Sequence, residues 1–159
     1  GNRYPVAYCN WTTAGLERGD RQECYEKIDR NACFFENTVV PRASTWSRQA
    51  ECAYVVSPEG FGIDCHRTWE ALALGCIPIV KQSGISKVFE DLPVMIVRDW
   101  REVQSDNLIN FYHQIKDKAF DFSRLFLRYW LDKVRESPRG IFPPMGLDEF
   151  RNVLLKANG

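Results

Sequence analysis

The chain of 159 residues is 45% hydrophobic and 13% aromatic, and its 21 lysines and arginines balance its 21 aspartates and glutamates. This length suits one domain with a substantial core, the apolar content argues against a disordered chain, and zero net charge argues against a dedicated nucleic-acid-binding surface. No apolar run approaches the ~20 residues that a membrane-spanning helix needs, and no signal peptide is visible at the start.

Predicted strands and helices alternate along the chain. In chain order we expect a strand at 5–9, a helix at 17–30, a strand at 32–35, a helix at 44–52, a strand at 53–57, a helix at 64–75, a strand at 77–80, a short helix at 84–90, a strand at 92–97, and helices at 105–119, 122–136 and 147–157. Strands that are apolar on both faces indicate a parallel sheet covered by helices on both sides. The sequence therefore predicts an α/β fold, a single Rossmann-like three-layer domain with about five parallel strands.

Proline and glycine residues interrupt the chain after the last long aromatic helix. We therefore place the Rossmann-like domain at residues 1–140 and a C-terminal helical extension at 141–159. Because the chain opens on Gly1 rather than Met, we expect either a domain excised from a longer protein or a tag remnant.

Two loops that follow the first two strands carry candidate ligand-binding residues. Thr12 and Thr13 come after the first strand, and their hydroxyl groups could bind a phosphate or face solvent in a turn. Arg42 comes after the second strand and could reach a diphosphate, although exposure to solvent is the commoner fate of an arginine. Trp46, in the helix that follows, is expected to anchor the core rather than to stack on a base.

The stretch from 53 to 80 reads as a strand, a loop with two glycines, a helix and a second strand. Asp64 stands where an N-cap is expected, and Gly75 stands where the helix should end. Such a βαβ unit places a ligand site beyond the carboxyl ends of its strands, next to the N-terminus of its helix. The sequence thus predicts a binding crevice here.

We expect this crevice to combine positive charge, loop backbone and one carboxylate. Its predicted members are Ser57, Glu59, Gly60, Gly62, Asp64, Arg67, Glu70, Lys81 and Ser83. Arg67 and Lys81 beside a helix N-terminus predict an anion site, and the loop glycines would permit positive φ and close approach to a ligand. Glu70 lies one helical turn beyond Arg67 and could accept hydrogen bonds from sugar hydroxyls. Asp64 suits an N-cap better than a catalytic base.

The residues Arg67-x-x-Glu70-Ala71-Leu72, followed by the segment Gly75-Cys76-Ile77-Pro78-Ile79-Val80, resemble the nucleotide-sugar-binding motif of exostosin-like glycosyltransferases. They also resemble the wider class of two-Rossmann-domain (GT-B) glycosyltransferases. The resemblance implies that Glu70 binds the ribose, that Arg67 binds the diphosphate, and that both are catalytic residues. Many retaining members carry two glutamates with seven residues between them, whereas Glu59 and Glu70 have ten, so the resemblance does not indicate the stereochemistry.

The resemblance further implies that the chain corresponds to one half of a GT-B fold, the donor-binding half. The donor would be a nucleoside diphosphate sugar, with UDP favoured over GDP, and the acceptor a hydroxyl of a glycan. Arg67, Lys81 and backbone N–H groups would stabilise the leaving diphosphate, so no metal ion or other cofactor would be required. The general base would come from an N-terminal Rossmann-like domain outside this chain.

Two other interpretations stay open. The chain could be a nucleotide-binding module without transferase activity, or another Rossmann-type enzyme such as a dehydrogenase. The dehydrogenase is disfavoured because no Gly-x-Gly-x-x-Gly follows the first strand.

The six cysteines form no Cys-x-x-Cys pair, and with two histidines they predict no zinc site. We favour buried thiols in a reducing, cytoplasmic compartment. The alternative is disulfides in a secretory lumen such as the Golgi, and a glycosylation sequon at Asn10 would agree with that alternative.

Overall fold

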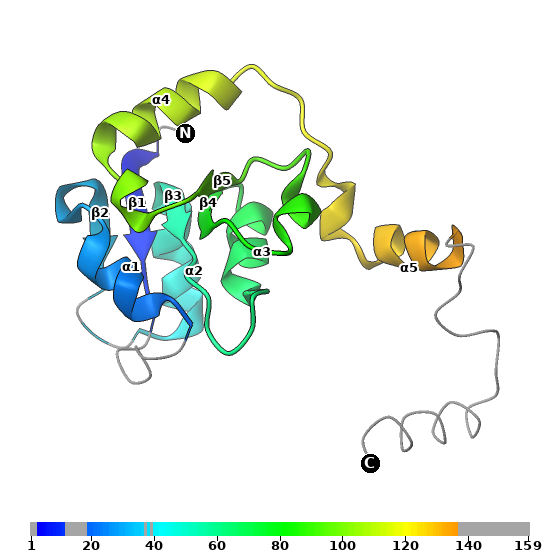
Figure 1. Cartoon of the computed structure of the whole chain (residues 1–159), viewed down its shortest axis with the longest axis horizontal. Helices are drawn as coiled ribbons and strands as arrows, with labels where there is room; N and C mark the ends of the chain where they lie inside the picture. Colours follow the sequence, from blue (N-terminus) through cyan, green and yellow to red (C-terminus); the bar gives the residue numbers. More distant parts are fainter. Residues whose placement is uncertain (1–2, 12–18, 37, 39, 137–159) are drawn as a thin grey trace, which may run out of the picture. The chain divides into compact units, whose positions relative to one another are not determined.

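The computed structural model describes residues 3–11, 19–36, 38 and 40–136. These residues include a sheet of five parallel strands in the order β2-β1-β3-β4-β5 (Figure 1). The strands are β1 (Tyr4–Cys9), β2 (Cys33–Phe35), β3 (Cys52–Val56), β4 (Ile77–Lys81) and β5 (Met95–Val97). The α-helices are α1 (Arg21–Lys27), α2 (Arg42–Glu51), α3 (His66–Ala73), α4 (Ser105–Ile115) and α5 (Leu127–Glu136). The prediction of a Rossmann-like α/β domain with one parallel sheet is confirmed.

Four short 3₁₀ turns complete the described elements: η1 (Arg30–Ala32), η2 (Ser86–Phe89), η3 (Trp100–Glu102) and η4 (Phe122–Leu125). The helix predicted at 84–90 is therefore the 3₁₀ turn η2, and the aromatic helix predicted from 122 divides into η4 and α5. The helix predicted at 147–157 lies outside the described residues.

The chain divides into two compact units, and the second begins at Ser123. The first contains the whole sheet and helices α1 to α4, and the second contains α5. The predicted boundary between residues 140 and 141 lies outside the described residues and stays a prediction.

Each face of the sheet packs its own hydrophobic cluster, because successive side chains of a strand point to opposite sides. Ala7 of β1 packs with Cys24 of α1 and Leu108 of α4. The next residue, Tyr8, packs with Ala71 of α3 on the opposite face. Helices therefore cover both faces of the sheet, as its doubly apolar strands predict.

The end of α3 sets the direction of the chain into β4. Gly75 has φ +71°, its N–H donates to Leu72 O at 2.9 Å, and the Cys76 N–H donates to Ala71 O at 2.8 Å. This is the Schellman arrangement, which ends a helix at a residue in the left-handed conformation. Gly75 thus ends the helix as predicted.

Candidate functional site

The strand order reverses beside β1, because the chain runs from β1 to β2 on one side and then crosses to β3 on the other. In open α/β sheets, ligands bind in the crevice at this switch point, beyond the carboxyl ends of the strands. The structure has a cleft of about 260 Å³ at this place, between the loop after β1 and helices α2 and α3. It is lined by Tyr8, Asn10, Val40, Arg42, Thr45, Trp46, Gln49, His66, Arg67 and Glu70.

Arg67 is the second residue of α3 and lies at the cleft with most of its surface covered. Its Nε donates to Asn10 O at 3.1 Å, and its Nη1 lies 3.4 Å from Cys65 Sγ. Burial lowers the pKa of the guanidinium, and the nearby charge of Arg21 lowers it further. The guanidinium is still the charged form at neutral pH, so a partly buried positive charge lies at the place where an anion is expected.

Glu70 follows one helical turn later and lines the same cleft. Its Oε1 forms an ion pair with Nη2 of Arg42, which is the first residue of α2. The Arg42 guanidinium also lies over the Trp46 ring, 5.5 Å from its centroid. The structure therefore unites Arg42, Arg67 and Glu70, three of the predicted ligand-binding residues.

Helix α2 begins at Arg42, two residues earlier than predicted, and Pro41 is its N-cap residue. Arg42 thereby lies on a helix instead of in a loop. Trp46 is 41% exposed at the cleft, so the prediction that it anchors the core is wrong.

The floor of the cleft is a set of polar side chains bonded to one another. The Tyr8 hydroxyl donates to Glu36 Oε1 at 2.8 Å, and Asn10 Nδ2 lies 3.3 Å from both the Tyr8 hydroxyl and Thr45 Oγ1. Burial and the Glu36 carboxylate raise the pKa of Tyr8, which keeps its phenol protonated. Gln49 is also buried here, and no partner bonds its Nε2 within the described part of the chain.

Seven of the predicted ligand-binding residues that the structure describes do not line this cleft: Ser57, Glu59, Gly60, Gly62, Asp64, Lys81 and Ser83. Ser57 is buried, and its Oγ lies 2.9 Å from Thr68 Oγ1. Lys81 Nζ donates to Glu23 Oε2 at 2.5 Å. The Ser83 N–H donates to Ser86 Oγ at 2.9 Å. Ser57, Glu59, Lys81 and Ser83 are thus held in contacts of their own.

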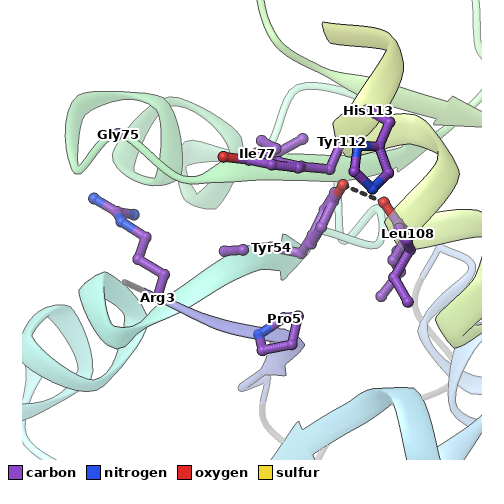
Figure 2. Close-up of a pocket in the computed structure, with 10 residues that line it drawn as sticks. Arg3, Pro5, Tyr54, Gly75, Ile77, Leu108, Tyr112 and His113 are labelled. Atoms are coloured by element: carbon purple, nitrogen blue, oxygen red, sulfur yellow. Dashed lines mark hydrogen bonds between the residues drawn. The ribbon is translucent and has the colours of Figure 1, made fainter. Parts of the chain in front are cut away.

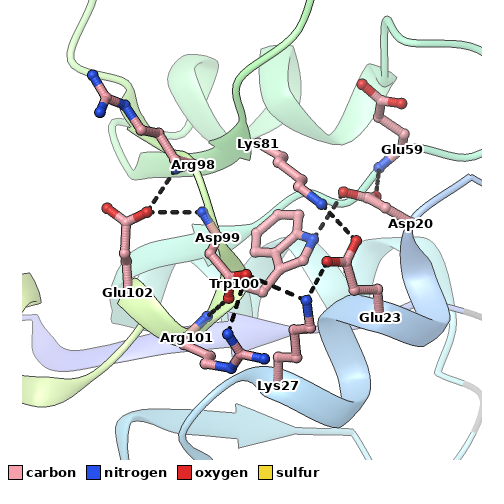
Figure 3. A network of polar contacts seen from close by, with 10 residues as sticks. All are labelled: Asp20, Glu23, Lys27, Glu59, Lys81, Arg98, Asp99, Trp100, Arg101 and Glu102. Atoms are coloured by element: carbon pink, nitrogen blue, oxygen red, sulfur yellow. Dashed lines mark hydrogen bonds and ion pairs between the residues drawn. The ribbon is translucent and has the colours of Figure 1, made fainter.

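Glu59 belongs to a polar network around Asp20 (Figure 3). Asp20 accepts from the Glu59 N–H at 2.7 Å and from Trp100 Nε1 at 2.8 Å. Burial raises the pKa of Asp20, and burial followed by the Asp20 charge raises the pKa of Glu59. The network fixes the loop after β3 to the start of α1.

The loop between β3 and α3 differs from prediction. Asp64 is not the N-cap, because α3 begins after Cys65 and Asp64 Oδ1 instead accepts from Trp69 Nε1 at 2.8 Å. Gly60 and Gly62 do not have positive φ, so the expected role of positive φ in this loop is wrong. A Cβ on Gly60 would lie 2.7 Å from Arg21 Nη2, whereas a Cβ on Gly62 would meet nothing within 4 Å.

Several polar side chains at or near the site were not anticipated, among them Tyr8 and Thr45 of the cleft lining, Arg21 and Gln49. Arg21, the first residue of α1, lies against Gly60, and its buried Nε has no partner among the described residues. Gln49 lies seven residues after Arg42 on α2, a spacing of about two turns that a helical-face argument could have found. The predicted Thr12 and Thr13 lie outside the described residues.

A larger cavity of about 530 Å³ lies at the opposite edge of the sheet, between α4 and the starts of β1, β3 and β4 (Figure 2). Its lining is mostly apolar, and two of its polar groups are occupied. Arg3 donates to Leu74 O at 2.7 Å and to Cys76 Sγ at 2.9 Å, and the Tyr54 hydroxyl donates to Leu108 O at 2.6 Å. Because ligands of open α/β sheets bind at the carboxyl edge, we favour the smaller cleft as the functional site.

Within the described residues, no group of three or more histidine, cysteine, aspartate or glutamate side chains is arranged to hold a metal ion. The same part of the chain contains no helix long and apolar enough to cross a membrane. The sequence matched no protein-family model, and a search of curated proteins found no match.

Proposed function

We propose that this chain is the donor-binding part of a glycosyltransferase and corresponds to one half of a GT-B fold. It would bind a nucleoside diphosphate sugar, with UDP favoured over GDP. The observation that carries the proposal is that Arg67 and Glu70, which form the motif resembling exostosin-like enzymes, line one cleft at the switch point of the sheet.

The diphosphate would lie at the mouth of the cleft. Arg67 is suited to this role because its contact with Asn10 O orients a guanidinium that is already partly buried. Arg42 supplies a second charge from the start of α2. Two guanidinium groups can bind phosphate oxygens in a forked geometry that a lysine does not provide.

Glu70 would accept hydrogen bonds from the ribose hydroxyls. Its present partner Arg42 is an exposed side chain, with 65% of its surface accessible. An exposed ion pair of this kind is worth no more than about 1 kcal/mol. Binding of a nucleotide can therefore redirect Arg42 to phosphate and free Glu70 for the sugar at small cost.

In the reaction, the oxygen of an acceptor hydroxyl forms a bond to the anomeric carbon. The bond from that carbon to the β-phosphate oxygen breaks, and the nucleoside diphosphate leaves with the electron pair. Arg42 and Arg67 would stabilise the charge that develops on the leaving phosphate. The proton of the acceptor would pass to a general base on a second, N-terminal domain outside this chain.

One observation favours the alternative of a nucleotide-binding module without transferase activity. Glu70 is the one carboxylate among the described residues that line the cleft, and it is already paired with Arg42. The described part of the cleft thus offers no free carboxylate to act as a base.

Calorimetric titration with UDP, GDP, their sugar conjugates and NAD tests the proposal. We expect binding of UDP or a UDP-sugar and none of NAD. Tight binding of NAD alone would identify a dehydrogenase-like site instead. An assay of sugar transfer, with the chain alone and with an added N-terminal domain, separates a transferase from a binding module.

A further inference from the structure

Three polar residues are buried in the described chain, and Gln49 is the one among them whose side chain has an unpaired polar atom. Ser57 and Thr68 are also buried, but they bond each other at 2.9 Å. Gln49 is 1% exposed, and its Nε2 has no hydrogen-bond partner within the described residues. A buried amide N–H without a partner is costly, and such a group in a folded protein calls for a specific explanation.

The neighbours of Gln49 do not supply an acceptor. The Tyr8 hydroxyl, Asn10 and Thr45 are bonded to one another and to Glu36. Cys76 Sγ lies 3.3 Å from Gln49 O, a contact to the backbone of Gln49 that leaves its amide unpaired. Gln49 lines the cleft, so a molecule bound there is the remaining source of an acceptor.

The cleft has a charged end and a neutral end. Arg42, Arg67 and Glu70 form the charged end, and Arg42 stands at the start of α2. Gln49 lies on the same helix about 10 Å farther along the axis, since seven residues rise by about 1.5 Å each. Trp46 lies between them in the sequence of the helix and also lines the cleft. A ligand that matches both ends carries phosphate at one end and a flat neutral group with hydrogen-bond acceptors at the other.

We infer that Gln49 is a specificity-determining residue that binds a carbonyl oxygen of the nucleobase, the uracil of UDP. This inference rests on the proposed function, because it requires a nucleoside diphosphate in the cleft. Uracil presents a carbonyl oxygen beside a ring N–H, and a carboxamide can donate to the first and accept from the second. The base then satisfies the amide that the empty protein leaves unpaired.

The substitution Gln49→Met tests the inference, because it keeps the length of the side chain and removes both polar groups. We expect the affinity for UDP to fall about tenfold and the affinity for inorganic pyrophosphate, which has no base, to stay unchanged. The melting temperature of the unliganded variant should be equal to or above that of the wild type, because an unpaired buried amide has been replaced by an apolar group. The matched control is Gln114→Met on the exposed face of α4, which should change neither affinity.

A second variant, Gln49→Glu, puts an acceptor where the uracil oxygen needs a donor and should weaken UDP binding more than Gln49→Met does. The inference is overturned if Gln49→Met binds UDP as the wild type does, or loses affinity for pyrophosphate equally. It is also overturned if Gln49→Met melts well below the wild type, because the amide would then be part of the structure. A wild-type chain that binds no nucleoside diphosphate overturns the proposed function and this inference together.

Discussion

The expected role of Arg67 in binding an anion depends on the position and orientation of its side chain as well as on its charge. Its Nε bonds Asn10 O across the cleft, and burial lowers its pKa. The hydrogen bond fixes the direction of the guanidinium, and neighbouring residues cover most of the side chain. A group prepared in this way binds an anion without first being ordered or dehydrated.

Replacing Arg67 by alanine should therefore weaken UDP binding by about 2–4 kcal/mol, the scale for removing one partner of a desolvated charge pair. Calorimetric titration measures this loss. The control is Arg98→Ala, since Arg98 is exposed and lies outside the cleft, and it should bind UDP as the wild type does. Equal affinity of wild type and Arg67→Ala would exclude Arg67 from the site.

Glu23 forms ion pairs that we expect to stabilise the folded protein rather than to bind a ligand. It accepts from Lys27 at 2.6 Å and from Lys81 at 2.5 Å, and these two bonds lower its pKa (Figure 3). A lowered carboxyl pKa stabilises the fold above the ordinary glutamate value of about 4.3, and the stabilisation is lost as the pH falls through the lower folded value.

We expect Glu23→Gln to reduce the free energy of unfolding near pH 7 by no more than about 1 kcal/mol, because the pair is partly exposed. The difference from wild type should shrink as the pH is lowered below about 4. Urea denaturation at several pH values measures both. Glu26→Gln is the control, since Glu26 bonds Gln22 rather than a cation. A deficit that grows toward acid pH would contradict this assignment.

At the scale of elements, the sequence predicts the central βαβ unit well. The strand predicted at 53–57 is β3, and the strand predicted at 77–80 is β4, each within one residue at either end. Runs of buried apolar residues mark such strands clearly, because both of their faces are covered. The spacing of Arg67 and Glu70 likewise fixes them to one helical face before any tertiary contact is known.

The sequence is less informative about side chains that have more than one possible hydrogen-bond or ion-pair partner, because tertiary contacts decide which partner they take. Asp64 could cap α3 or accept the Trp69 indole N–H, and the fold uses the second option. Lys81 was expected beside Arg67, but Glu23 on α1 pairs with it. Arg21 and Gln49 reach their places only when α1 and α2 pack on the sheet, which no local pattern specifies.

The Schellman turn after α3 provides a test of an element boundary. Gly75 has φ +71°, and an added Cβ would also lie 3.3 Å from Arg3 Nη2. Gly75→Ala should therefore reduce the free energy of unfolding by about 1–2 kcal/mol, the cost of the left-handed conformation for an L-residue. Affinity for UDP should be unchanged, because Gly75 is remote from the cleft lining.

Chemical denaturation of Gly75→Ala and of a control, Gly84→Ala, checks this expectation. A Cβ on Gly84 would meet nothing within 4 Å, and its φ is not positive. The control should unfold like the wild type. Equal stability of Gly75→Ala and wild type would mean that the turn tolerates a side chain and does not require glycine.

At the scale of the molecule, the candidate site belongs to one of two compact units. All described residues that line the cleft come before Phe122, the end of the first unit, and so do the five strands. The first unit also contains every described residue of the two hydrophobic clusters that pack on the sheet. Every described residue of these clusters and of the cleft lining thus belongs to the first unit.

A chain that ends at Phe122 should consequently unfold cooperatively and bind UDP with the affinity of the whole chain. Saturating UDP, at about 100 times its dissociation constant, should stabilise both chains by about 2.7 kcal/mol, because ligand binds only the folded state. Thermal melting with and without UDP measures this gain. If the shortened chain folds but shows no gain, residues beyond Phe122 contribute to the site. If it does not fold, the division into two units does not reflect independent stability, and the site must be sought in the whole chain.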